Sequence, residues 1–195
     1  NDNELSNLLA IYSSNEITSN AVSSEQKLMV VFKSLGVTCS GNEVVKGLEE
    51  IKSEARKIFN DDTFAEDLNI SLDGYSITYN EINNNYTIKL NSCPSSEDFI
   101  VKSVVKATRA DDEIYIYQAF GYFVKGPENK YFVYDSALKT NQIGEFIDEA
   151  GTKEFNEVEK LKQFKWTFKK SSDNNYYFVS VTPVIWLNKS LRLFK

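Results

Sequence analysis

The chain has 195 residues, 42% of them hydrophobic and 26% charged, which are ordinary values for a globular protein. A chain of this length buries roughly 70% of its unfolded surface, so it can form a hydrophobic core of its own. It contains no run of about 18 apolar residues, which excludes a transmembrane helix. The net charge of −6 is uneven: residues 1–98 carry 16 acidic and 7 basic residues, and residues 99–195 carry 12 acidic and 15 basic residues.

The first 20 residues predict a polar extension. Leucines at helical spacing within residues 3–12 predict a short amphipathic helix there. The chain opens at Asn1 with polar residues, and we expect that a signal or anchor has been trimmed from this end. We therefore expect an extension over residues 1–20 and one folded domain over residues 21–195.

Two helices are predicted after the extension. Residues 23–26 form a capping box, and Gly36 is a natural stop for the helix that follows. A second capping box over residues 40–43 precedes a long apolar stripe. This pattern predicts an amphipathic helix that starts at Val44 and ends between residues 59 and 61.

Past Gly74 the hydrophobic period changes from that of a helix to that of a strand. Alternating apolar residues separated by turns of Asn, Asp and Gly predict successive antiparallel hairpins. The predicted strands cover residues 75–79, 86–90, 99–105, 114–123 and 131–134. Residues 137–163 are less regular, and Phe155, Val158 and Leu161 predict a short helix.

The last hairpin has the most regular pattern in the sequence. Phe164, Trp166 and Phe168 alternate with polar residues, and the chain returns at residues 176–181 after a polar turn. The tail over residues 184–194 fits a further strand or a helical turn. Helices followed by strands predict an α+β fold with helices packed on a curved antiparallel sheet, an element order similar to cystatin-like and ketosteroid-isomerase-like folds.

Several reaction classes are excluded. The chain has no histidine, which removes Ser-His-Asp and Cys-His catalysis and histidine metal sites. It also lacks the glycine-rich phosphate loops of nucleotide-binding proteins. Three Ser-x-x-Lys matches occur by chance in a chain rich in both residues, and Ser103 and Lys106 are expected on opposite faces of a strand. We expect no catalytic residue, no metal and no cofactor.

Acidic clusters and aromatic side chains are the remaining candidates. The acids at residues 61–67 and 111–113 are interpreted as solvated helix ends and turn tips. Aromatic residues on the long central strand and the last hairpin could line a ligand site, with a second core face as the alternative. The candidate ligand-binding residues are Tyr115, Tyr117, Phe123 and Trp166.

Two further features bear on the setting of the protein. Cys39 and Cys93 are its only cysteines, and they fit either a disulfide in an exported protein or two buried thiols in a cytosolic one. The basic residues after Lys160 alternate with apolar ones, which favours a solvated sheet face over an anionic-polymer site. Nucleic acid is not an expected partner.

Five short segments of the sequence resemble segments of uncharacterised surface or lipoprotein-type proteins of low-GC Gram-positive bacteria. These segments cover residues 22–28, 114–117, 141–144, 165–170 and 175–178. The resemblance implies an exported, membrane-anchored setting and transfers no site residues.

We therefore expect a non-catalytic extracytoplasmic binding or accessory domain whose partner is a protein or a small molecule. The alternative is a small-molecule carrier or enzyme that uses carboxylate or tyrosine groups in a cavity between sheet and helices.

Overall fold

The computed structural model describes residues 16–39, 41–65, 71–72, 74–91, 97–136 and 138–184. The predicted helix over residues 3–12 lies outside the described residues, and so does the tail from residue 185. The α+β class is confirmed, because two α-helices accompany two antiparallel sheets. The predicted single sheet is therefore divided into a large one and a small one.

The large sheet has seven strands and follows the order β1-β10-β9-β6-β7-β8, with β5 paired to the other edge of β6. All of its strand pairs are antiparallel. Its strands are β1 (Ile17–Thr18), β5 (Phe99–Ala110), β6 (Glu113–Lys125), β7 (Lys130–Tyr134), β8 (Gln142–Ile147), β9 (Lys162–Lys170) and β10 (Tyr176–Pro183).

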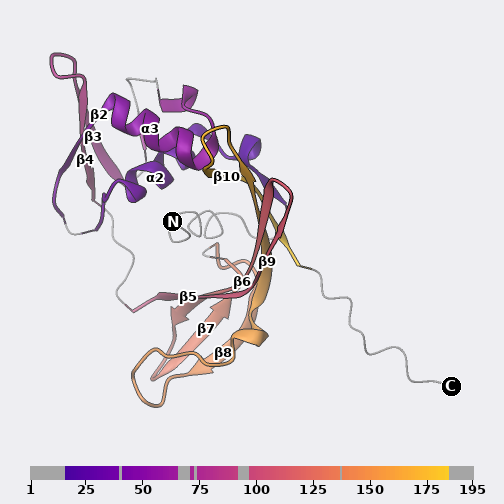
Figure 1. Cartoon of the computed structure of the whole chain (residues 1–195). Coiled ribbons are helices and arrows are strands. Elements are labelled where there is room, and N and C mark those ends of the chain that lie inside the picture. The colour runs from indigo at the N-terminus through magenta and orange to yellow at the C-terminus, as the bar shows by residue number, and fades with distance from the viewer. Residues whose placement is uncertain are drawn as a thin grey trace.

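The small sheet has the order β2-β4-β3, and the two helices lie between it and the upper end of the large sheet (Figure 1). One core joins these three layers. The elements are β2 (Val44–Gly47), β3 (Tyr75–Asn80), β4 (Asn85–Leu90), α2 (Ser24–Ser34) and α3 (Leu48–Phe59), with short 3-10 helices η1 (Ser19–Ala21), η2 (Thr63–Ala65) and η3 (Val158–Lys160).

Helix α2 follows the sequence pattern closely. The Ser23 hydroxyl accepts a hydrogen bond from the Gln26 backbone, and the Gln26 side chain caps the Ser23 backbone in return. The chain leaves the helix through Gly36, whose φ of +90° suits glycine. Ile17, just before this region, is 4% exposed and belongs to the core, although it falls within the predicted extension.

The predicted start of the second helix is wrong. Residues from Val44 to Gly47 form strand β2, and α3 begins at Leu48 with no side-chain cap. Val44 pairs with Ile88 of β4, so pairing with a strand more than 40 residues away overrides the helical stripe. The helix ends as predicted, at Asn60 in a left-handed conformation.

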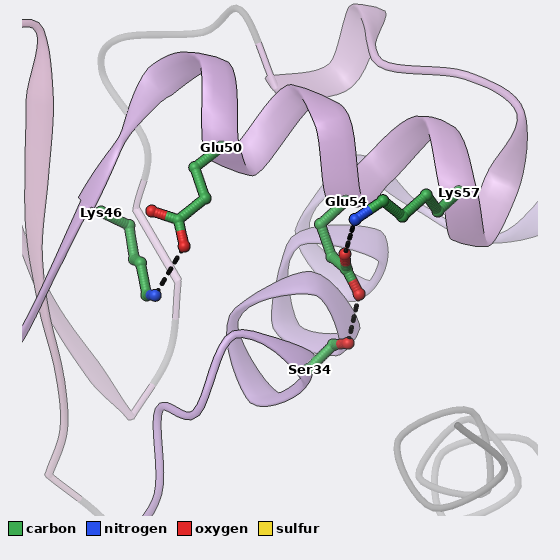
Figure 2. Close-up of polar contacts among 5 residues, drawn as sticks. All are labelled: Ser34, Lys46, Glu50, Glu54 and Lys57. Carbon is green, nitrogen blue, oxygen red and sulfur yellow. Dashed lines mark hydrogen bonds and ion pairs between the residues drawn. The ribbon is translucent and has the colours of Figure 1, made fainter.

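Polar contacts on the outside of α3 tie it to its neighbours (Figure 2). The Ser34 hydroxyl at the end of α2 donates to Glu54, which also pairs with Lys57 at 3.1 Å. Burial raises the pKa of Glu54, but these two partners outweigh it, so the pKa lies below its usual value. Lys46 of β2 pairs with Glu50 at 2.6 Å. Glu54 therefore holds the two helices together as a carboxylate.

The predicted hairpins are confirmed. Four of their turns contain a residue with positive φ, and in three of the four it is Asn or Asp, which tolerate this conformation. These residues are Asn84, Asp111, Glu128 and Asn174. Residues 137–163, which have a less regular pattern, contain strand β8 and the 3-10 helix η3, and Phe155 precedes η3 in irregular backbone. The predicted short helix is therefore present only as the three-residue η3, and Phe155 lies outside it.

The side chains of β6 divide between two cores. Phe120 contributes to the core that contains α2, α3 and the small sheet. Ala119 and Phe123 point to the opposite face and form a second core with β7 and Leu161. The Phe123 ring lies 4.7 Å from that of Phe99 and 5.0 Å from that of Phe155.

The large sheet forks at Gly121. On one edge, β6 pairs with β9 up to Phe120 and then with β7 from Tyr122. At Gly121 a Cβ atom would lie 2.8 Å from Leu161 and 2.9 Å from Phe123, so a larger residue would require these side chains to shift.

A buried ion pair lies beside the fork. Asp135, which follows β7 and is 0% exposed, accepts from Lys162 of β9 and from Asn141, both at 2.8 Å. The pair connects the ends of β7 and β9, the two strands that separate at the fork. Removing Lys162 would leave the buried carboxylate of Asp135 without its cation.

The fork predicts that Gly121→Val destabilises the fold by about 1–3 kcal/mol, because the added side chain overpacks against Leu161 and Phe123. Gly144→Val in β8 is the matched control, since nothing lies within 4 Å of a Cβ atom there. Urea unfolding measures both variants. Equal losses in the two variants would contradict the role of Gly121.

Candidate binding surface

The structure separates the four predicted site residues. Tyr115, Tyr117 and Phe123 share one face of β6, whereas Trp166 pairs with Ile116 and lies on the other face. Phe123 is 0% exposed and Trp166 is 3% exposed, each in a different core. Only the two tyrosines are outside both cores, so the structure does not bring the four together as one site.

Around the two tyrosines, four neighbouring strands form a polar and aromatic surface, which we name the Tyr–Lys face. Cross-strand pairing aligns Lys106, Tyr117 and Lys165 in one row. The next rows add hydroxyl groups and a third tyrosine. The face consists of Lys106, Thr108, Glu113, Tyr115, Tyr117, Lys165, Thr167, Lys169, Tyr177, Ser180 and Thr182.

Lysines lie over the tyrosine rings of this face. The Nζ atom of Lys165 is 4.0 Å from the centre of the Tyr115 ring, and that of Lys106 is 5.6 Å from the Tyr117 ring. The Tyr115 hydroxyl donates to Glu113, and this hydrogen bond raises the pKa of Tyr115 above its usual value. The hydroxyl therefore stays protonated at neutral pH, and the face carries three cations and one anion.

A cleft of about 780 Å³ opens at the end of the Tyr–Lys face. It shares Glu113, Lys169, Tyr177 and Ser180 with the face and continues past the edge of β10 toward η1 and the end of α3. Concave polar surfaces of this size suit ligands, because they bury part of the ligand and offer several hydrogen-bonding groups.

The floor of the cleft contains an ion pair between Lys27 of α2 and Asp61 after α3, at 3.1 Å. Lys27 is 7% exposed, and its Nζ atom also lies 5.6 Å and 5.1 Å from the ring centres of Phe59 and Phe64. Burial raises the pKa of Asp61, but hydrogen bonds from Thr63 and Lys27 outweigh it, so the pKa lies below its usual value. Asp61 is therefore a fixed anion at neutral pH and not a proton donor.

Two other groups singled out in the sequence are the acids after α3 and the Ser103/Lys106 pair. Asp62 pairs with Arg56, and the acids at residues 66 and 67 lie outside the described residues. Ser103 and Lys106 share a face, contrary to expectation, because a bulge between Val104 and Lys106 shifts the register. In the part of the chain that the structure describes, no group of three or more acids or cysteines is placed to hold a metal ion.

Sequence reasoning missed the cleft because its parts are far apart in the chain. Lys27 and Asp61 are 34 residues apart, and nothing in the local pattern links a helix residue to an acid in a loop. Lys27 does face the apolar side of α2, next to Leu28 and Val31, and a charged residue in that position is the one available signal.

Comparison of the chain with known proteins finds no matching family, no matching curated protein and no matching solved structure. Among the described helices, none has the length and apolar character needed to cross a membrane.

The cleft generates a test of the Lys27–Asp61 pair. Asp61→Asn leaves the Lys27 charge buried and is expected to cost about 2 kcal/mol, less than a fully buried pair because Asp61 is 36% exposed. Lys27→Met keeps the contacts with both rings and is expected to stay within about 1 kcal/mol of the wild type.

The pH dependence follows from the lowered pKa of Asp61. The ionised carboxylate of Asp61 contributes to the stability of the fold above its pKa in the unfolded chain, near roughly pH 4. This contribution is lost as the pH falls through the lower pKa of the folded state. The difference in the free energy of unfolding between the wild type and Asp61→Asn should therefore be smaller in acid. Chemical unfolding at pH 7 and pH 3 measures this, and a Lys27→Met variant as unstable as Asp61→Asn would refute the interpretation.

Proposed function

We propose that this chain is a non-catalytic binding or accessory domain of an anchored extracytoplasmic protein, and that the Tyr–Lys face with its cleft is the binding surface. The observation that carries the proposal is the continuity of the two: the aligned lysines and tyrosines lead directly into a polar cleft. Charged and hydroxyl-bearing side chains suit a polar ligand that carries anionic groups.

The state of Cys39 supports the extracytoplasmic setting. Cys39 is disulfide-bonded, and Cys93, which lies outside the described residues, is the only other cysteine in the sequence. Disulfides persist mainly in oxidising compartments. The resemblance to surface and lipoprotein-type proteins points the same way. Fractionation of source cells tests this setting, and a protein confined to the cytosol would contradict it.

The alternative, a carrier or enzyme with a cavity between sheet and helices, has less support. The side chains that meet in this interface are at most 3% exposed, namely Phe32, Phe59, Phe120, Phe164, Trp166 and Phe178. The carboxyl groups with clear shifts, Glu54 and Asp61, have lowered pKa values, whereas acid catalysis at neutral pH needs a raised one. The comparison with cystatin-like and ketosteroid-isomerase-like folds rests on element order and carries no site residue to this chain.

A sulfated hexasaccharide of the heparin type serves as a probe for the proposed surface, titrated by calorimetry at low and high salt. Lys106→Gln combined with Lys165→Gln should weaken binding about fivefold, because two exposed charge contacts contribute about 0.5 kcal/mol each. The affinity of the wild type should also fall as salt screens these charges.

The matched control is Lys57→Gln combined with Lys160→Gln, which removes two exposed positive charges outside the face and outside the lining of the cleft and should leave binding unchanged. Equal weakening in both double variants would show that only net charge matters. No binding of the wild type to the probe would refute an anionic ligand.

A further inference from the structure

Strand β5 has an edge that no described residue pairs. It runs for 12 residues, from Phe99 to Ala110, and among the described residues it pairs only with β6 (Figure 1). An edge of this kind presents a row of backbone N–H and C=O groups that can pair with another extended chain. Proteins use such edges to bind peptides by adding a strand to the sheet.

Exposed apolar side chains accompany this edge. Val104 is 52% exposed, Val105 is 51% exposed and Ile100 is 38% exposed. Ile100 and Val104 pair with Tyr122 and Gln118, so both lie on the same face of the sheet. An added strand would place its own alternate side chains beside them and remove this apolar surface from water.

The charge of β5 decides between possible occupants. The strand carries Lys102, Lys106 and Arg109 and no acid. Pairing with a second copy of β5 would set two wholly basic strands side by side, which is unfavourable because like charges across a strand pair repel. An extended segment with acidic residues would instead carry charge of the opposite sign.

We propose that β5 is an acceptor strand for an acidic, extended peptide segment of a partner protein, which adds to the edge of the large sheet that no described residue pairs. The bulge between Val104 and Lys106 divides the edge into two runs. The added strand pairs with the run from Phe99 to Val104. Its apolar side chains lie on the face of Ile100 and Val104, and its acidic side chains lie on the opposite face, which is the face of Lys106 beyond the bulge. The proposal does not depend on the ligand of the Tyr–Lys face.

The probe is a capped eight-residue peptide in which glutamate alternates with valine, and its comparison is the same peptide with lysine in place of glutamate. The acidic peptide should bind, and the basic one should bind at least about tenfold more weakly, since several like charges would oppose those of β5. In hydrogen exchange, the acidic peptide should protect backbone amides of β5. Equal binding of both peptides, or binding without protection of β5, would overturn the proposal.

Val104→Ser combined with Val105→Ser should weaken binding of the acidic peptide about tenfold, the effect of losing roughly two buried methylene equivalents. The matched control is Val45→Ser on β2, where the side chain is 58% exposed on the other sheet, and its binding should equal that of the wild type. Circular dichroism checks that each variant is folded.

Two results would separate this inference from other accounts. A dimer in sedimentation equilibrium that the Val104/Val105 variant abolishes would assign the edge to a second copy and overturn the peptide proposal. Unchanged peptide binding in the Lys165→Gln variant, together with lost binding in the Val104/Val105 variant, would support edge pairing independently of the Tyr–Lys face.

Discussion

The side chains of β6 alternate between two hydrophobic cores, and the packing of both cores depends on this alternation. Phe120 belongs to the first core on one face, while Phe123 packs against the aromatic residues of the second core on the other. Gly121 lies between them, where the absence of a Cβ atom lets Leu161 approach and where the pairing of β6 changes from β9 to β7. Because β6 supplies side chains to both cores, the packing of each half of the large sheet depends on the same strand.

Local patterns predict the hairpins well, because period-two alternation and Asn-rich or Asp-rich turns act over a few residues, as at Phe164, Trp166 and Phe168. They fail where distant pairing overrides them, as at Val44. For the candidate site, the sequence identifies Tyr115 and Tyr117 but not their neighbours. Register and contacts between distant elements determine the features that a single sequence does not encode locally. These are the face of the sheet on which each residue lies, the bulge after Val104 and the Lys27–Asp61 pair.

The two proposed surfaces belong to the same sheet and share Lys106 of β5, but they use different chemical groups. The Tyr–Lys face uses side chains on strands that already have partners, so its chemistry is that of charged and aromatic groups held in fixed rows. The edge of β5 uses backbone groups and half-exposed valines, so its chemistry is that of strand addition. Both lie outside the two cores, and variants at either surface can therefore be made without opening the interior.

Native-state hydrogen exchange at increasing denaturant tests the central claim, that both cores depend on β6 and unfold together. The most protected amides of the first core, around Val31 and Ile88, and those of the second, around Val133, should report the same free energy of opening and the same denaturant dependence. A second core that opens with a much smaller free energy while the first stays closed would contradict the claim and would show that β6 joins two independent units.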